Sequence, residues 1–324
     1  MCRTSLKLLC VSLALCGLAP CGLAGAASGD EPPRFEVAAS LAGGAVKFVV
    51  YGDTRFTRRE DVVNAFARRT LVKRIAQENP ALILIGGDLV YEGSNPGDYE
   101  TYQSETAEWS NQKIPVFPAL GNHEFKGCPE DVSPCLENWW KAFAPLRPHR
   151  WYSVTVASSL LALILDSDSP LKPHSEQRIW FEQQIAGADR NIKFILVLLH
   201  YPPVRDPFYP RAQDEKQVAS YLSRRAGSLH ARVVVVGSHV HNYERYKRDG
   251  VTYLVSGGGG AKPVPAARMF GELSRLTTSV NFHFMRFTLE NDRLSATMVR
   301  LDAAADQSRE PWSEPDQFEI RAKD

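Results

Sequence analysis

Five short apolar runs in the chain each lead, within three residues, into an aspartate, an asparagine or a histidine. Runs of this length without polar interruption are typical of strands buried on both faces of a sheet. The runs are Val46–Tyr51, Ala81–Ile85, Ile114–Leu120, Phe194–Leu199 and Arg232–Val236. Helical patterns lie between them, at Val62–Asn79, Leu136–Phe143, Ser175–Ala186 and Gln213–Arg225. This alternation predicts a layered α/β domain with mixed sheets.

The polar residues after these runs form one candidate site. They are Asp53, Asp88, Asn122, His200, His239 and, two residues further on, His241. Ligands bind at the carboxyl ends of strands in open α/β sheets, so we expect these side chains to converge at one sheet edge. Burying them together is costly unless a cation compensates them. A mixture of carboxylate, amide and imidazole donors suits iron, manganese or zinc better than calcium.

The overall composition excludes several classes of protein. Hydrophobic residues make up 44% of the chain and charged residues 23%, which is unlike a disordered, collagen-like or coiled-coil sequence. Lys and Arg total 38 against 37 Asp and Glu, so the formal charge is +1. This balance gives no general attraction to nucleic acid or to anionic lipid.

The first 26 residues are typical of a secretory signal peptide. Arg3 and Lys7 form a basic start, Leu8 to Leu18 form an apolar stretch, and Ala24-Gly25-Ala26 resembles a cleavage site. We therefore predict export, to a periplasm or to the medium, without stable membrane insertion. An uncleaved membrane anchor and a lipid anchor at Cys21 are the alternatives.

Only two cysteines lie beyond this leader. Cys128 and Cys135 flank a short loop that contains two prolines. In an oxidising compartment, a local disulfide between them is the favoured interpretation, and two free thiols are the alternative.

At these motifs the chain resembles the calcineurin-like metallophosphoesterases, and within them the purple acid phosphatases. The resemblance runs from Val46 to Leu301 and covers five motifs in order. It implies a four-layer αββα sandwich with two mixed β-sheets. Together with the leader, this predicts four segments: a signal peptide (1–26), a loose lead-in segment (27–45), a catalytic domain (46–303) and a C-terminal tail (304–324).

The resemblance also assigns roles to single residues. Asp88 bridges two metal ions, and Asn122, His200 and His239 hold one of them. Asp53, His241 and Tyr91 hold the other. His123 contacts the phosphate or the leaving group as the catalytic residue, and Glu124 orients this motif from behind the ligands.

Tyr91 bears on the identity of the metals. The broader family reads Asp-x-His in its first motif, but Arg55 stands at that position here. The purple branch lacks this histidine and uses a tyrosine three residues after the bridging aspartate, where Tyr91 lies. A phenolate ligand at neutral pH favours a strongly Lewis-acidic ion. We therefore predict Fe(III) at the Tyr91 site with Fe, Zn or Mn at the second site; a pair of Mn or Zn ions is the alternative.

The chain departs from the purple branch in two places. Ser238 lies between Gly237 and the first histidine of the His-x-His pair, and residues 201–229 lack the further histidine that this branch carries. Arg55, Arg205 or Arg211 is predicted to contact the phosphate instead, because a guanidinium matches its oxygens.

The resemblance implies an enzyme with two metal ions, which the leader predicts to be exported. It would hydrolyse phosphate monoesters by direct attack of a metal-bound hydroxide on a small substrate, with no partner nucleic acid specifically implied. A phosphodiesterase or nucleotide hydrolase on the same site is the first alternative. A non-catalytic metal-binding protein is the second.

Overall fold

The computed structural model describes residues 31–39, 41, 44–205, 213–264, 274–276, 282–301 and 311–323. The predicted signal peptide and Arg211 lie outside these residues. Among the helices of the described part, none has the length and apolar character needed to span a membrane.

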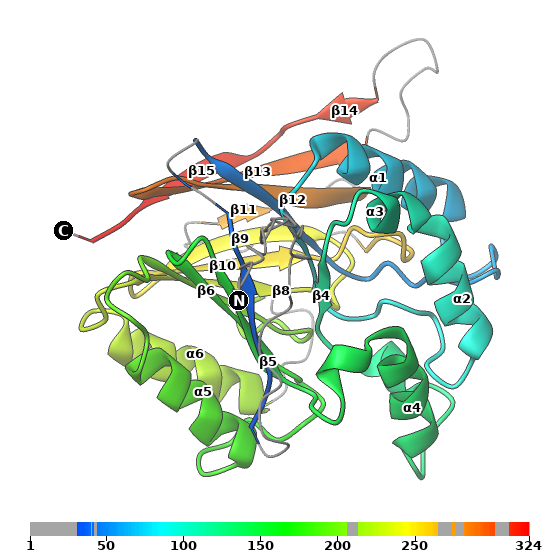
Figure 1. Ribbon diagram of the computed structural model, residues 1–324, viewed down its shortest axis with the longest axis horizontal. Helices are drawn as coiled ribbons and strands as arrows, with labels where there is room; N and C mark the ends of the chain where they lie inside the picture. The colour runs from blue at the N-terminus through cyan, green and yellow to red at the C-terminus, as the bar shows by residue number, and fades with distance from the viewer. Residues whose placement is uncertain are drawn as a thin grey trace, which may run out of the picture.

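Two β-sheets form the centre of the described structure (Figure 1). One has eight strands, in the order β1 (Arg34–Val37), β5 (Tyr152–Val156), β6 (Leu160–Ile164), β7 (Phe194–Leu198), β8 (Arg232–Gly237), β10 (Val251–Ser256), β9 (Tyr243–Arg248) and β11 (Ser274–Leu276). The other has seven, in the order β14 (Trp312–Ser313), β13 (Arg293–Leu301), β12 (Phe282–Leu289), β2 (Val46–Tyr51), β3 (Ile83–Ile85) and β4 (Val116–Pro118), with β15 (Gln317–Arg321) beside β13. Each sheet contains parallel and antiparallel pairs.

Helices lie on both sides of the two sheets (Figure 1). On one side are α5 (Glu176–Ala186) and α6 (Gln213–Arg225). On the other are α1 (Ala65–Glu78), α2 (Pro96–Glu105), α3 (Ala107–Asn111) and α4 (Ser133–Ala142), with the short 3-10 helices η2 (Asn122–Phe125) and η3 (Ala144–Leu146). The predicted four-layer sandwich with two mixed sheets is confirmed.

Strand β7 shows why the sequence forms these layers. Phe194, Leu196 and Leu198 pack into the core between the sheets. The alternate residues Ile195 and Val197 pack into a second core with side chains of α5 and α6. Successive side chains of a strand point to opposite faces, so an uninterrupted apolar run supplies both cores.

The strand ends bring the polar residues together. β2, β3 and β4 run parallel with Tyr51 opposite Ile85 and Ile85 opposite Pro118, and β7 runs parallel to β8. Asp53, Asp88 and Asn122 therefore follow the seven-stranded sheet, whereas the histidines follow the eight-stranded sheet. The prediction of convergence at the edge of a single sheet is wrong in this respect, because the stacked sheets share one end.

The sheets extend beyond the predicted boundaries of the catalytic domain. β1 lies in the segment expected to be a loose lead-in, and it pairs in parallel with β5. β14 and β15 lie in the expected C-terminal tail, and both pair with β13. Backbone pairing therefore ties both segments to the sandwich.

Candidate metal centre

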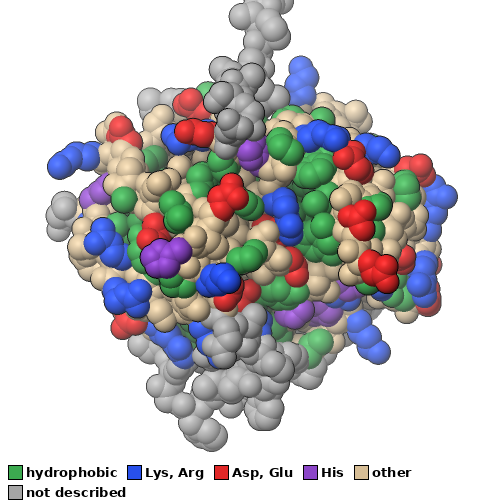
Figure 2. Space-filling view, turned by 90° about the horizontal axis from the view of Figure 1, so that it is seen from below, with side chains coloured by type: hydrophobic (Ala, Val, Ile, Leu, Met, Phe, Trp, Pro, Cys, Tyr) green, Lys and Arg blue, Asp and Glu red, His purple; other side chains and the backbone are tan. Residues whose placement is uncertain are grey.

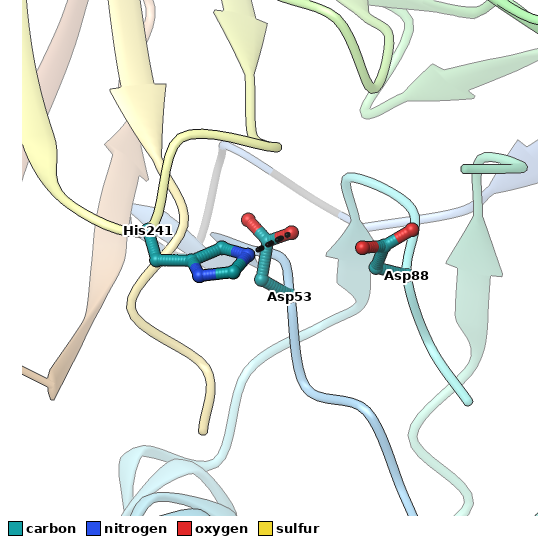
Figure 3. A group of neighbouring side chains, drawn as sticks. All are labelled: Asp53, Asp88 and His241. Carbon is teal, nitrogen blue, oxygen red and sulfur yellow. Dashed lines mark ion pairs between the residues drawn. The ribbon is translucent and has the colours of Figure 1, made fainter. Parts of the chain in front are cut away.

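Asp53, Asp88 and His241 form a first cluster. Each residue offers one oxygen or nitrogen that can bind a metal, and these atoms lie within 4.8 Å of one another. Both aspartates are fully buried. Figure 3 shows the His241 ring directed at Asp53, with Asp88 on the far side; His241 Nε2 lies 3.6 Å from Asp53 Oδ1. His241 Nδ1 donates to the Lys262 carbonyl at 2.8 Å, so Nε2 presents a lone pair. Within the described residues, neither Asp53 oxygen has a hydrogen-bond partner. These acceptors lack the donors that buried polar atoms require.

A second cluster surrounds His200. Its Nδ1 donates to the Gly86 carbonyl at 2.9 Å, so its Nε2 also carries a lone pair. Three further atoms with lone pairs that can bind a metal lie near this Nε2: Asn122 Oδ1 at 3.1 Å, Asp88 Oδ1 at 3.2 Å and His239 Nδ1 at 3.2 Å. One imidazole nitrogen cannot form hydrogen bonds to all of them. A cation among the four atoms would satisfy every lone pair, and these residue types suit a transition metal.

The chain turns sharply to deliver these side chains. Asp53, Asp88 and His239 have φ values of 58°, 51° and 66°, in the left-handed region that non-glycine residues rarely adopt. Such a conformation costs on the order of 1 kcal/mol or more at each residue and persists only when the surroundings impose it. The Asp53 N–H donates to the Gly87 carbonyl at 3.1 Å, which fixes one of these turns.

The histidines of both clusters are neutral at pH 7. Burial lowers the pKa of His200, and it lowers that of His239 to about 3 and that of His241 to about 4. Burial alone would raise the pKa of Asp88, but His200, His123 and Arg55 outweigh it and hold that pKa well below its ordinary value. Burial, and then the Asp88 charge, raise the pKa of Asp53 well above its ordinary value.

These histidines predict a pH dependence for the ion-free protein. A pKa lowered by folding means that the unfolded chain binds more protons, so the stabilisation present above about pH 6.5 is lost as the pH falls toward 4. In chelator, we expect the free energy of unfolding of the wild type, relative to that of a His239→Asn/His241→Asn variant, to decrease from pH 6.5 to pH 4. Urea unfolding across this range measures the difference. A difference that does not change with pH contradicts the prediction.

Gly257 shows how tightly the first cluster is packed. A Cβ at this position would lie 2.4 Å from Asp53 Oδ2 and 2.6 Å from the Val240 carbonyl oxygen. We expect Gly257→Ala to displace the Asp53 carboxylate, to lower the number of ions retained per chain, and to cost about 1–3 kcal/mol of stability through overpacking. Metal analysis and thermal unfolding measure both effects. Gly227→Ala is the matched control, because no atom lies within 4 Å of its Cβ position; equal behaviour of the two variants contradicts the prediction.

Glu124 joins two of the loops that carry residues of the candidate site. Its carboxylate accepts the backbone N–H groups of Asp88, Val90 and Gly121 at 2.9, 3.1 and 2.7 Å. Burial and the Asp88 charge raise the pKa of Glu124 well above its ordinary value, against these three hydrogen bonds. Glu124 therefore acts on the position of Asp88 through the backbone.

His123 lies at the edge of both clusters. Its backbone N–H donates to Asp88 Oδ1 at 2.9 Å, and its Nδ1 bonds to the Tyr91 carbonyl at 2.5 Å. Its Nε2 remains on the site side, 3.9 Å from Asp88 Oδ2. Burial lowers the pKa of His123, while Asp88 opposes that shift.

The Tyr91 ring packs beside His123, and the cationic side chains of Lys126 and Arg59 lie over the Tyr91 ring. The ring centroids of Tyr91 and His123 lie 5.3 Å apart. Lys126 Nζ lies 3.5 Å and Arg59 Cζ 5.3 Å from the centroid of the Tyr91 ring. The carbonyl of Tyr91, not its hydroxyl, makes the hydrogen bond to His123. This contact does not involve the Tyr91 hydroxyl, so the role of that hydroxyl as a metal ligand stays a prediction.

The arginines predicted to bind substrate have different surroundings. Arg55 donates to Asp88 Oδ2 from Nε at 3.2 Å and from Nη2 at 2.9 Å. Arg205 is 3% exposed, and its charge contributes to lowering the pKa of His200 and His239. Their contacts with phosphate stay predictions.

A disulfide lies beside the loop that carries His123. Cys128 and Cys135 are bonded, as predicted. Cys135 lies in α4, where Asn138 Nδ2 donates to the Gly93 carbonyl, two residues after Tyr91. We expect a Cys128→Ser/Cys135→Ser variant to lose about 2–3 kcal/mol of stability. The two cysteines are seven residues apart in the sequence, and without the disulfide the unfolded chain regains the conformational freedom of this loop. Denaturant unfolding measures the loss. Equal stability of the oxidised wild type and the variant contradicts the prediction.

A polar pair beside the second cluster, Tyr201 and Asp168, was not predicted from the sequence. The Tyr201 ring packs against His239 and His200, with centroid distances of 4.6 and 5.1 Å. Its hydroxyl donates to Asp168 Oδ1 at 3.2 Å. Burial raises the pKa of Asp168 to about 7. The signal was present, because the apolar run Leu160–Leu165 also leads into aspartates, at Asp166 and Asp168.

Comparison with known families and sequences gives consistent matches. The family model described as calcineurin-like phosphoesterase matches residues 46–257. Purple acid phosphatase 21 of Arabidopsis thaliana is 25% identical over 211 residues, which are 62% of this chain and 45% of that protein. Purple acid phosphatase 22 of the same plant is 26% identical over 232 residues, 68% of this chain and 50% of that protein. The chain thus spans about half the length of these curated relatives.

Solved structures share the fold at low sequence identity. Purple acid phosphatase PPD1 from yellow lupin (Lupinus luteus) has a TM-score of 0.68 at 17% identity, covering 86% of this chain and 54% of that chain. GAP50, described as the anchor in the inner membrane complex of Plasmodium, has a TM-score of 0.59 at 18% identity, covering 86% and 90%. Identities this low support the fold and nothing more specific.

Proposed function

The chain belongs to the calcineurin-like phosphoesterase family, and from this premise we propose that it hydrolyses phosphate monoesters at a centre of two metal ions. Its distant similarity to purple acid phosphatases supports this choice of substrate. The ions would share Asp88. Asp53, His241 and Tyr91 would complete the first site, and Asn122, His200 and His239 the second.

One observation carries the proposal: lone pairs converge on both sides of one carboxylate. On one side, Asp88 lies beside the two oxygens of Asp53, which have no hydrogen-bond partner within the described residues. On the other side, Asp88 Oδ1 lies 3.2 Å from His200 Nε2. In this second cluster, the lone pairs of Asn122 Oδ1 and Asp88 Oδ1 both face His200 Nε2. The donor set therefore fits two transition-metal ions.

When bound, such ions supply Lewis acidity to the phosphoryl oxygens and to the attacking water. The chain itself supplies the proton for the leaving group. The Tyr91 carbonyl holds His123 Nδ1–H, so a second proton on this ring resides at Nε2, which faces the site. From there it can be donated to the leaving oxygen. The sequence contains no serine or cysteine in a nucleophile motif, which favours direct attack by water over a phospho-enzyme.

Arg55 and Arg205 are proposed to bind the phosphate oxygens. Arg55 uses Nε and Nη2 for Asp88, which leaves further N–H donors on the same guanidinium for an anion. Arg205 brings a buried positive charge to the side of His200 and His239. A small phosphate ester fits this arrangement. Basic and acidic side chains are interspersed on the face shown in Figure 2.

Two metal pairs are proposed for the centre. Tyr91 favours Fe(III) at the first site with Fe, Zn or Mn at the second, and the alternative is a pair of Mn or Zn ions. We also propose that the protein is exported after cleavage of residues 1–26, which the disulfide supports because such bonds persist in oxidising compartments.

Assays of the purified protein on p-nitrophenyl phosphate and on bis(p-nitrophenyl) phosphate test the function. We expect turnover of the monoester that a chelator abolishes and added metal restores. Faster turnover of the bis-ester would favour a phosphodiesterase or nucleotide hydrolase instead. No chelator-sensitive turnover of either ester would favour a non-catalytic metal-binding protein.

A further inference from the structure

Arg55 is held against Asp88 by its backbone as well as by its side chain. Its guanidinium contacts Asp88 Oδ2 twice, at 3.2 and 2.9 Å, and its backbone N–H donates to the Asp88 carbonyl at 2.9 Å. Its own carbonyl accepts from Arg68 Nη1 at 3.1 Å. The residue has a φ of 47°, and its side chain is 14% exposed. The guanidinium is therefore a fixed part of the site and not a solvated surface charge.

The two oxygens of Asp88 have different neighbours. Oδ1 lies 3.2 Å from His200 Nε2 and accepts the His123 backbone N–H, so it belongs to the second cluster. Oδ2 receives Arg55. The Arg55 charge also contributes to lowering the pKa of Asp53 and of His241. Every member of the first cluster thus lies within the electrostatic reach of this guanidinium.

We infer that Arg55 sets the charge of the ion at the first cluster, so that this site retains a divalent cation in preference to a trivalent one. The inference rests on the proposed two-ion centre. A fixed guanidinium repels any cation bound at the same carboxylate, and the repulsion grows with the charge of that cation. At separations of about 5 Å and an effective dielectric constant of about 20, each further unit of charge lowers the affinity by a factor on the order of 100.

This inference decides between the two metal pairs that are proposed above. A tyrosine ligand favours Fe(III), but the guanidinium on Asp88 acts against it at the same site. Of the proposed pairs, the contacts of Arg55 therefore favour the divalent one, manganese or zinc.

A competition between zinc and gallium tests the inference. Ga(III) carries the charge of ferric iron without its redox chemistry. The ion-free protein is dialysed against Zn(II) and citrate-buffered Ga(III), and the bound metals are counted by mass spectrometry. Arg55→Gln removes the charge while keeping an N–H donor for Asp88, and Arg55→Lys is the control that keeps the charge. We expect the Ga/Zn affinity ratio at one of the two sites to rise on the order of 100-fold in Arg55→Gln and to change only a few-fold in Arg55→Lys.

Three results would overturn the inference, and each has a different meaning. An unchanged Ga/Zn ratio in Arg55→Gln, with a raised KM for the phosphate ester, assigns Arg55 to substrate binding alone. A wild-type protein that retains Ga(III) at full occupancy against equimolar Zn(II) overturns it without any variant, so the test stands even if Arg55→Gln fails to fold. A wild-type protein that binds fewer than two ions per chain overturns the two-ion centre itself and this inference with it.

Discussion

Asp88→Asn is expected to release the ions from both clusters and to lower kcat/KM for p-nitrophenyl phosphate by about 10³-fold or more. Both oxygens of Asp88 are in use: Oδ1 lies beside His200 Nε2, and Oδ2 receives Arg55. An amide keeps the shape of the side chain but replaces one acceptor with a donor and removes the charge. It also leaves the partly buried Arg55 guanidinium without its anionic partner, which is costly in itself.

Metal content per chain and steady-state kinetics measure this effect together. Asp61→Asn is the matched control, because it makes the same chemical change at a carboxylate that is 68% exposed and pairs with Arg59. An Asp88→Asn protein that is folded, retains two ions and turns over at the wild-type rate would contradict the central role of this residue. Circular dichroism of each variant separates loss of ions from loss of folding.

His123→Ala is expected to lower kcat by about 10²–10⁴-fold while leaving the metal content unchanged. His123 Nε2 lies on the side of the clusters, 3.9 Å from Asp88 Oδ2, which is beyond hydrogen-bond distance of that oxygen. Its side chain is therefore free to act on the leaving group. The loss should depend on the substrate, because a poor leaving group such as an alkoxide needs the proton more than p-nitrophenolate does.

Comparison of an alkyl phosphate with p-nitrophenyl phosphate checks this dependence. The ratio of wild-type to His123→Ala rates should be larger for the alkyl ester. His230→Ala is a suitable control, because His230 is exposed and its Nε2 bonds to the Asp189 carbonyl, away from the candidate site. An equal loss for both esters would contradict a role as proton donor and favour one in orienting the phosphate.

The sequence predicted best those elements whose own residue pattern matches their place in the fold. Uninterrupted apolar runs predicted the strands β2, β7 and β8 to within two residues. The polar residue after each run then predicted the clusters, because a parallel strand can deliver a side chain only at its carboxyl end. Asp53, Asp88 and His241 were predicted in this way, and the structure brings them within 4.8 Å of one another.

Elements whose formation depends on distant partners were missed. Strand β1 has only four residues, none of them fully buried, and exists because it pairs with β5, more than 100 residues away. Helix α2 has a polar sequence that buries few apolar side chains, chiefly Tyr99 and Tyr102. Its start signals are present, with Asn95 as the cap and Pro96 at the first turn, but the helix lacks the apolar periodicity that identifies a helix in a sequence.

The contacts of Arg55 and Tyr201 could not be predicted for a similar reason. Each depends on the distance between loops from different strands, and a sequence pattern does not contain that distance. Arg55 was predicted to bind phosphate, yet the structure turns two of its N–H groups toward Asp88. The Tyr201–Asp168 pair joins loops that are 33 residues apart in the sequence.

Anomalous diffraction from crystals of the metal-loaded protein tests the central claim most directly. We predict two anomalous peaks, one on each side of Asp88: the first beside Asp53 and His241, and the second beside Asn122, His200 and His239. A single peak, or peaks that do not contact Asp88, would contradict the two-ion centre on which the proposed function depends.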